Sequence, residues 1–314
     1  DSSNTLNNQP IERIHLQRLM AAAAEGPAVI TAVVHPTDRE ALLGMLAGRD
    51  AGLIEPLLVG PEAKIRAAAD AAGLDLGECE IIPVPHSHAA AAKAVELVQA
   101  GRAQALMKGN LHTDEFMHAV VASLRTERRM SHVFAFDVPT YERPLLITDA
   151  ALNIAPNLSA KRDIVQNAID LSQALGNPQP KVAILSAVET VTSKIPSTLE
   201  AAALCKMADR GQITGGLVDG PLAFDNAVSP EAAAIKKIDS PVAGQADILV
   251  VPDLESGNML AKQLEYLGGA EGAGIVLGAR VPVILTSRAD DTVSRVASCA
   301  LAKLWGRNRP GAAL

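Results

Sequence analysis

Aromatic side chains are scarce in this sequence: Phe, Trp and Tyr together make up 2% of its 314 residues. The hydrophobic fraction is nevertheless 48%, so the interior must be built from Ala, Val, Leu and Ile, as in sheets covered by Ala-rich helices. This composition excludes disorder on the scale of the whole chain. A chain of this length suits two domains of about 150 residues each, with a cleft between them.

Cysteine is also rare. Cys79, Cys205 and Cys299 are odd in number and far apart in the sequence, which argues against a disulfide framework and favours a reducing compartment. Apolar runs such as 28–34 and 248–251 are too short to span a membrane, and the printed N-terminus lacks the order of a signal peptide. We therefore expect a cytoplasmic protein with no membrane partner.

An excess of basic residues is absent too, since the formal net charge is -7. No basic stripe follows from the sequence, so we expect no nucleic-acid partner. One short basic cluster does occur, at Arg125, Arg128 and Arg129. It is either a solvated hinge face or, if it lies near a cleft, a group of charges that attracts phosphate groups. The histidines lack ligand spacings such as HExxH, and the cysteines lack CxxC, so we predict no metal site.

The sequence does contain a repeated pattern of apolar strand, polar loop and amphipathic helix. Runs typical of strands occupy 28–34, 56–59, 81–84, 105–107, 132–138, 145–148, 181–186, 216–219, 248–251 and 281–285. Helical patterns lie between them, for example at 161–175, 198–209 and 291–304. This alternation predicts an α/β protein with two doubly wound α/β/α domains and an interdomain cleft. Ligands of such sheets gather beyond the carboxyl ends of the strands, so the loops there are the candidate site.

The loop after the last predicted strand carries the most chemistry, because Ser287, Arg288, Asp290 and Asp291 lead into the first turn of a helix. A serine hydroxyl can stabilise an oxyanion, a guanidinium can hold a phosphate, and a carboxylate can accept a proton. The alternative is an ordinary helix cap, in which a hydroxyl bonds the helix amides and the aspartates complement the helix dipole.

Two lysines follow predicted strands in similar positions. Lys108 precedes Gly109 and Asn110, with Thr113 shortly after them, so an ammonium, an amide and a hydroxyl can converge on a phosphate or a carbonyl group. Lys194 lies at the analogous place in the second half of the chain. For either lysine alone, a solvated loop charge is the simpler interpretation.

Other loops are rich in small residues. The run 240–244 precedes a predicted strand, and an acidic turn containing Gly257 and Asn258 follows that strand. Asn258 either contacts a ligand or caps the next helix. The glycine-rich run 268–274 follows a helix instead of a strand, which makes it a poor dinucleotide motif and favours a closely packed bend.

Taken together, these segments resemble the phosphate acetyltransferase and phosphate butyryltransferase family from about residue 28 onward. The distinctive pieces are Lys-Gly-Asn at 108–110 with Thr113, Thr-Asp-Ala-Ala-Leu-Asn at 148–153, Ser-Pro-Val-Ala-Gly at 240–244, Pro-Asp-Leu at 252–254 with Gly257 and Asn258, and Thr-Ser-Arg-Ala-Asp at 286–290. Several pieces look more like the butyryltransferase branch. The second piece adds Asp149 and Asn153 to the residues expected to bind substrate.

The resemblance implies a discontinuous first domain of residues 1–130 plus 281–314, a second domain of residues 131–280, and a fold similar to isocitrate and isopropylmalate dehydrogenases. It also implies a homodimer or higher homo-oligomer with active sites in the interdomain clefts. Coenzyme A, inorganic phosphate and an acyl phosphate are the implied substrates, with no permanently bound cofactor. Some similar proteins carry a preceding enoyl-CoA hydratase domain, so such a domain before Asp1 is an open alternative.

The family's catalytic roles transfer only in part. The transition-state serine and the phosphate-binding arginine of the family fall on Ser287 and Arg288. The family's thiol-deprotonating aspartate does not carry over, because the seventh position after the serine is Ser294. Asp290 and Asp291 are the neighbouring candidates for this base.

A second departure concerns the arginines that hold phosphate from the first domain of acetyltransferases, because Phe116 and Met117 stand where one is expected. The predicted function is direct acyl transfer between coenzyme A and phosphate, for acyl groups from acetyl to butyryl. The alternatives are a metal- and NAD-dependent dehydrogenase on the same fold and a catalytically weak sensor of coenzyme A or acyl phosphate.

Overall fold

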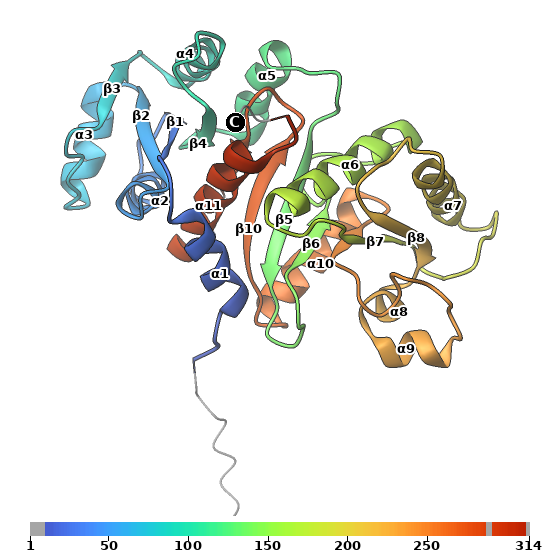
Figure 1. The fold of residues 1–314 in the computed structure, drawn as a ribbon. Helices are drawn as coiled ribbons and strands as arrows, with labels where there is room; N and C mark the ends of the chain where they lie inside the picture. The colour runs from blue at the N-terminus through green and yellow to red at the C-terminus, as the bar shows by residue number, and fades with distance from the viewer. Residues whose placement is uncertain (1–9, 287–290, 312–314) are drawn as a thin grey trace, which may run out of the picture.

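The structure is a computed structural model that describes residues 10–286 and 291–311 of the chain. The strands are β1 (Val29–Val34), β2 (Ile54–Gly60), β3 (Glu80–Pro83), β4 (Ala105–Lys108), β5 (Ser131–Asp137), β6 (Leu145–Thr148), β7 (Lys181–Leu185), β8 (Leu217–Leu222), β9 (Ile248–Val250), β10 (Glu271–Leu277) and β11 (Val283–Ile284). They form one mixed sheet in the order β3-β2-β1-β4-β11-β10-β5-β6-β9-β7-β8 (Figure 1).

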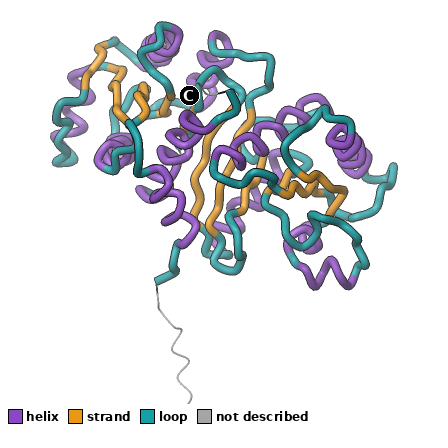
Figure 2. Tube along the Cα trace, viewed as in Figure 1, coloured by secondary structure: helices purple, strands orange, loops and turns teal. Residues whose placement is uncertain are grey.

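The helices are α1 (Ile14–Ala23), α2 (Arg39–Asp50), α3 (Glu62–Ala71), α4 (Ser87–Gln99), α5 (Thr113–Ser123), α6 (Leu158–Ala174), α7 (Pro196–Asp209), α8 (Phe224–Val228), α9 (Pro230–Ile235), α10 (Leu254–Tyr266) and α11 (Thr292–Asn308). Figure 2 shows the strands running through the middle of the molecule with helices around them. The predicted α/β class is confirmed, and every predicted strand overlaps an observed one.

Two groups of parallel strands make up most of the sheet. The first group is β3, β2, β1, β4 and β11, and the second is β6, β9, β7 and β8. Between them, β10 and β5 are antiparallel to each other and to their outer neighbours. The two parallel groups therefore run in opposite directions, and their carboxyl ends emerge at opposite edges. The two sheets predicted from the sequence are joined into one by the long β10–β5 pair.

The prediction of a bend at 268–274 was wrong for most of that run, because β10 begins at Glu271 and pairs with β5 over its whole length. The glycines serve the pairing by making room for rings. A Cβ on Gly272 would lie 2.4 Å from Cε1 of Phe136, and one on Gly274 would lie 2.7 Å from Nε2 of His132. Glycine in this strand marks a close approach of aromatic rings on the neighbouring strand.

Helices cover both faces of the sheet. The apolar residues of α1, α2, α3, α6, α7 and α11 share one core with one face. On the other face, α4 and α5 pack over the first parallel group, and α8 and α10 pack over the second. Adjacent residues such as Ala135 and Phe136 of β5 fall in different cores, as the alternation of a strand requires.

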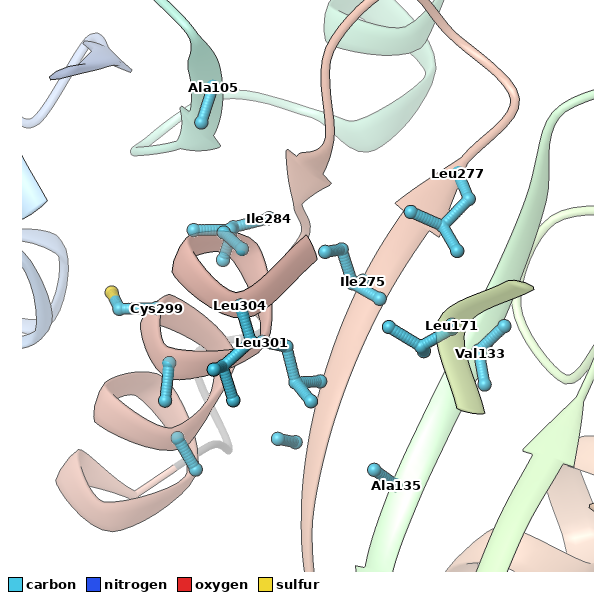
Figure 3. Close-up of a cluster of buried hydrophobic side chains, with 14 of the residues drawn as sticks. Ala105, Val133, Ala135, Leu171, Ile275, Leu277, Ile284, Cys299, Leu301 and Leu304 are labelled. Carbon is cyan, nitrogen blue, oxygen red and sulfur yellow. The ribbon is translucent and has the colours of Figure 1, made fainter. Parts of the chain in front are cut away.

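The C-terminal helix α11 lies beside the N-terminal elements (Figure 1). Figure 3 shows Leu301 and Leu304 of α11 in one cluster with Ile275 and Leu277 of β10. Near the end of α11, Lys303 Nζ donates to the carbonyl of Gly26 at 3.1 Å, just before β1. The end of α11 therefore lies at the amino end of β1, and its first turn lies toward the carboxyl end of that strand.

Candidate functional site

A cavity of about 490 Å³ opens at the carboxyl ends of β1, β4 and β11. The β4–α5 loop contributes Lys108, Gly109, Asn110 and Thr113 to its wall, and the turn after β11 contributes Thr286. This is the edge of a parallel sheet at which ligands usually bind. The structure thus brings together the predicted substrate-binding residues that follow β4.

Gly109 allows two loops to meet at this edge. Its amide donates to the carbonyl of Val34 at 2.9 Å, and the amide of Asn110 donates to the carbonyl of His35 at 2.8 Å. A Cβ on Gly109 would lie only 2.2 Å from the Val34 carbonyl oxygen. The loop after β4 can therefore lie against the loop after β1 only because residue 109 is glycine.

The backbone carbonyl and the side-chain amide of Asn110 also connect the loop after β4 to the loop after β1. Its carbonyl lies 2.7 Å from Nδ1 of His35, and its Nδ2 donates to Oγ1 of Thr37 at 3.0 Å. His35 is itself in the left-handed region, with φ 56°. This arrangement holds the backbone that carries Lys108 in place next to the first turn of α2.

The cavity lies at the first turns of four helices, because α2 contributes Ala41, α4 contributes Ser87, α5 contributes Thr113 and α11 contributes Arg295. The first amides of a helix have no partner within the helix, and the helix dipole is positive at this end. Helix N-termini of this kind favour anions such as phosphate or carboxylate.

Charged side chains of both signs border the cavity. The cations are Lys108 and Arg295, whereas Asp38 and Glu115 are among the acids. Asp38 caps α2 by accepting a hydrogen bond from the amide of Ala41 at 2.9 Å. Glu115 accepts a hydrogen bond from the hydroxyl of Ser87 at 2.8 Å. These two carboxylates thus hold helix ends in position, and Glu40 is a third acid in the lining.

The turn predicted to carry the chemistry is described only at its two ends. Ser287, Arg288 and Asp290 lie outside the described residues. Thr286 before them borders the cavity. Asp291 after them caps α11, with Oδ1 accepting from the amide of Ser294 at 2.8 Å, so the helix-cap alternative describes what the Asp291 side chain does in this structure.

Ser294 stands where the family resemblance placed an aspartate. Its hydroxyl donates to the carbonyl of Gly272 in β10, and its amide donates to the Asp291 cap. Ser294 thus ties the start of α11 to the sheet.

The carboxyl group of Glu271 lies beside the Asp291 cap. Partial burial, a hydrogen bond with Asp291 and repulsion from that carboxylate together raise the pKa of Glu271 from 4.5 to about 7. Arg13 opposes this shift. The folded chain therefore keeps a proton on Glu271 at pH values where an exposed glutamate has lost it.

This pKa predicts that stability falls as pH rises from about 4.5 to about 7, because only the unfolded chain releases the proton in that window. Glu271→Gln, which cannot ionise, should raise the melting temperature relative to the parent chain at pH 8 and leave it nearly unchanged at pH 5. Thermal unfolding across this pH range measures the effect. Glu55→Gln, on an exposed position of β2, is the control, and an equal shift at both pH values for Glu271→Gln contradicts the explanation.

Asp149 and Asn153 form a second cluster after β6. Oδ1 of Asp149 accepts hydrogen bonds from the amides of Ala151 and Leu152 at 2.9 and 2.8 Å. Its Oδ2 accepts from Nδ2 of Asn153 at 2.6 Å, and Asn153 Oδ1 accepts from Nε of Arg129 at 2.6 Å. The Asp149 carboxylate thus shapes the loop, while Asn153 and Arg129 border another cavity, of about 510 Å³.

Gly257 and Asn258 pack against the same loop. Both belong to α10, and a Cβ on Gly257 would lie 2.6 Å from Cγ2 of Val251 and 3.1 Å from Cβ of Ala150. Nδ2 of Asn258 donates to the carbonyl of Ala150 at 3.4 Å. The pair therefore holds α10 close to the loop after β6.

Lys194 lies apart from both cavities in an exposed turn before α7. Arg128 of the predicted basic cluster pairs with Asp170, and Arg125 and Arg129 border the second cavity. Because the two parallel strand groups end at opposite edges, these residues and the Asp149 cluster do not join the Lys108 loop. Their predicted roles as substrate contacts stay predictions.

Within residues 10–286 and 291–311, no three His, Cys, Asp or Glu side chains gather closely enough to hold a metal ion. In the described part of the chain, no helix has the length and apolar character needed to cross a bilayer.

Comparison with known proteins decides the family. The family described as phosphate acetyl/butaryl transferase matches residues 86–303. A phosphate acetyltransferase of Rhizobium meliloti is 64% identical over 307 residues, which cover 96% of this chain and 97% of the relative. The chain belongs to this transferase family. It is therefore an acyltransferase, as the sequence motifs predicted.

Solved structures support the same family assignment. A branched-chain phosphotransacylase from Enterococcus faecalis V583 has a TM-score of 0.75 and 33% identity, covering 88% of this chain and 98% of that one. A 4-hydroxythreonine-4-phosphate dehydrogenase from Klebsiella pneumoniae, with a TM-score of 0.55 and 12% identity over 88% of this chain and 98% of that one, shares the fold alone. The predicted dehydrogenase-like fold is confirmed.

The branch within the phosphotransacylase family differs from the one that the motifs favoured. A phosphate butyryltransferase of Clostridium acetobutylicum is 43% identical over 281 residues, covering 88% of this chain and 93% of the relative. This identity is well below that of the Rhizobium acetyltransferase. The predicted leaning towards butyryltransferases therefore finds no support in overall identity, because a few motif residues shared between branches do not represent the whole chain.

Sequence reasoning missed several residues of the phosphotransacylase cavity. His35 and Asp38 follow β1, and the rule that ligands bind after parallel strands could have identified them. Arg295 lies inside a helix and carries no local signal, because only tertiary packing shows which face of α11 borders the cavity.

Proposed function

We propose that this phosphotransacylase transfers an acetyl group, so that acetyl-CoA and inorganic phosphate give acetyl phosphate and coenzyme A, in the cavity next to Lys108. Coenzyme A is a substrate of this reaction and not a resident cofactor. The observation that supports the location is that Lys108, Arg295 and the first turns of four helices surround one space. An anionic substrate is favoured there by the positive ends of the helix dipoles.

In the direction of thioester synthesis, the thiol of coenzyme A loses its proton and the sulfur attacks the carbonyl carbon of acetyl phosphate. A carbon–sulfur bond forms, the carbon–oxygen bond to the phosphoryl group breaks, and phosphate leaves with the electron pair. No oxidation state changes, and the transfer needs no covalent enzyme intermediate. Holding both substrates in one cavity supplies much of the rate enhancement.

The proposed catalytic roles follow the order of these events. Ser287 donates a hydrogen bond to the carbonyl oxygen as negative charge develops on it. Arg288 and Lys108 attract the leaving phosphate. Asp290 and Asp291 are the proposed proton acceptors for the thiol, since the thiolate is the nucleophile.

The reaction is tested by following the ultraviolet absorbance of the thioester with coenzyme A and acetyl, propionyl or butyryl phosphate in parallel. We expect acetyl phosphate to give the highest kcat/KM. Faster turnover of butyryl phosphate would reverse the proposed acyl preference. Tight binding of coenzyme A without thioester formation from any of the three would overturn the proposed activity in favour of a sensor.

The molecule also offers a surface for self-association. Met259 and Tyr266 of α10 are 64% and 74% exposed, and the adjoining Leu267 is 82% exposed. We propose that α10 pairs with a second copy of the chain, because exposed apolar side chains on one helix favour burial in an interface. Light scattering should give the mass of a dimer, and Met259→Glu combined with Leu267→Glu should give the mass of a monomer.

Two broader expectations stay proposals. We propose that residues 1–130 plus 281–314 and residues 131–280 act as two domains, which the packing of the C-terminal helix α11 on α1 and α2 supports. We also propose a cytoplasmic location, since Cys79, Cys205 and Cys299 are all free thiols, as is usual in a reducing compartment. A reporter fusion localised by cell fractionation tests the second proposal.

A further inference from the structure

His35 is a half-buried imidazole at the carboxyl end of β1, and it borders the cavity that contains Lys108. Nδ1 of its ring lies 2.7 Å from the backbone carbonyl oxygen of Asn110. A carbonyl oxygen can only accept a hydrogen bond, so Nδ1 carries the hydrogen in the neutral ring. The hydroxyl of Thr37 is farther from Nδ1, at 3.4 Å, and does not change this assignment. Nε2 is therefore the ring nitrogen that offers a lone pair.

This second nitrogen is available to a ligand. In the described part of the chain, Nε2 of His35 makes no hydrogen bond, and it is not fully buried. The charged and titratable side chains that share the cavity wall are Lys108 of β4, Asp38 and Glu40 at the start of α2, His112 and Glu115 at the start of α5, and Arg295 of α11. None of these described groups bonds the His35 ring. A proton acceptor thus faces accessible space at the cavity wall.

The backbone of His35 is held firmly at this point. Its amide donates to the carbonyl of Val59 at 2.8 Å, and its carbonyl accepts from the amides of Thr37 and Asn110 at 2.9 and 2.8 Å. These bonds keep the residue in the left-handed region, with φ 56°. That region is unfavourable for most side chains, and residues held in it occur preferentially at active sites. The fold thus maintains an unfavourable backbone conformation at the residue whose ring borders the cavity.

The reaction proposed above needs a proton acceptor for the thiol of coenzyme A, and Ser294 stands where the family resemblance placed an aspartate. Asp291 is already engaged, because Oδ1 accepts from the amide of Ser294 and the carboxyl group forms a hydrogen bond with Glu271. Of the described residues near this turn, Thr286 and Arg295 border the cavity, whereas Asp291 does not. His35 combines the two properties that Asp291 lacks, a place on the cavity wall and an acceptor atom without a partner.

We propose that Nε2 of His35 receives the proton of the coenzyme A thiol during acyl transfer, in place of the carboxylates of the turn after β11. The sulfur attacks the carbonyl carbon of the acyl phosphate and forms the carbon–sulfur bond. The bond from that carbon to the phosphate oxygen breaks, and the electron pair leaves with phosphate. The imidazolium then gives its proton to the departing phosphate, so the ring is neutral again for the next turnover. This inference rests on the proposed function and names its general base.

His35→Asn removes the acceptor and preserves the surroundings. Asparagine tolerates a positive φ, and its side-chain amide can donate to the Asn110 carbonyl as Nδ1 does. We expect kcat/KM for thioester formation at about pH 7 to fall about 100-fold, a typical contribution of a general base. His118→Asn changes an exposed histidine of α5 that is not part of the cavity lining, and it should match the parent chain. A loss of less than about 3-fold in His35→Asn, or an equal loss in His118→Asn, would overturn the proposal.

The pH dependence of the defect distinguishes a base from a structural role. A thiol with a pKa of about 8.5 is mostly protonated at about pH 7 and mostly ionised at about pH 9.5. The defect of His35→Asn should therefore shrink from about 100-fold to less than about 10-fold between these pH values, because an ionised thiol needs no base. A defect of constant size would show a structural role only and overturn the proposal. A shrinking defect in Asp291→Asn, with none in His35→Asn, would assign the proton to Asp291 instead.

His35→Gly allows the base to be supplied from solution. Glycine adopts a positive φ without strain, and removal of the ring leaves room for free imidazole. We expect imidazole to raise the rate of His35→Gly by about 10-fold or more, in proportion to its concentration, and to leave the parent chain and His118→Asn unchanged. If His35→Asn does not fold, this variant decides the question, and a rate that does not respond to imidazole overturns the proposal.

Nuclear magnetic resonance of the His35 ring separates this inference from the proposed function, because it requires no turnover. The signal of the proton on Cε1, identified by its absence in His35→Asn, should shift when coenzyme A binds to the full chain. It should shift much less with desulfo-coenzyme A, which lacks the thiol. That difference supports the contact with the thiol even if the parent chain forms no thioester, in which case the proposed activity alone fails. Equal shifts with the two ligands overturn the inference even if the parent chain is fully active.

Discussion

Replacing Ser287 by Ala is expected to lower kcat about 100-fold while the chain stays folded, because a hydroxyl that bonds the oxyanion acts mainly in the transition state. The serine directly follows Thr286, which borders the cavity after β11. A contact made only in the transition state changes kcat and kcat/KM together and leaves KM nearly constant. Initial rates of thioester formation, with circular dichroism as the check on folding, measure this effect.

Two variants sharpen the Ser287 experiment. Ser287→Thr keeps a hydroxyl and should recover part of the lost rate. Ser123→Ala removes a hydroxyl from the last turn of α5, away from the cavity, and should leave kcat unchanged. Equal turnover of Ser287→Ala and the parent chain would remove the serine from the mechanism.

Gly109→Ala is expected to reduce both stability and activity strongly. The added Cβ would lie 2.2 Å from the Val34 carbonyl oxygen and 2.7 Å from that of His35. Both obstacles are backbone atoms that form the end of β1, so neither can rotate away as a flexible side chain can. We expect the free energy of unfolding to fall by about 3 kcal/mol, at the upper end of the usual cost of overpacking.

The same substitution should lower kcat/KM about 100-fold, because a shift of the loop by about 1 Å misplaces the Lys108 ammonium. Denaturant unfolding and initial rates measure the two effects. Gly306→Ala in α11 is the matched control, since a Cβ there meets nothing within 4 Å. It should leave activity unchanged and stabilise the chain by about 0.5 to 1 kcal/mol. A Gly109→Ala variant as stable as the parent would contradict the close approach of the two loops.

The helices and strands of this chain could largely be predicted from the sequence because their signals are local. An apolar run such as 248–251, followed by an acidic turn, predicts a buried strand without knowledge of its neighbours. The strand β10 is an exception, because Gly272 and Gly274 lower its strand propensity. These glycines are needed because the rings of Phe136 and His132 on β5 occupy the space that a side chain would fill. A signal that depends on another strand is not visible in the run itself.

The candidate site, too, could be predicted from the sequence only in part. The order of strands and loops was enough to mark Lys108, Gly109, Asn110 and Thr113 as neighbours of a ligand, because carboxyl ends of parallel strands collect such residues. It also grouped them with Lys194 and Asp149. The structure separates these groups, because the antiparallel β10–β5 pair reverses the direction of the second half of the sheet.

The sequence by itself therefore determined the α/β class, the positions of most elements and the family, all of which depend on residue order and short-range periodicity. Only the tertiary structure decided which loops share a cavity and that Arg295 borders it. The reason is physical: strand direction and helix orientation are set by contacts between residues far apart in the chain, such as Gly44 with Arg295. No local pattern records the partner that such a contact requires.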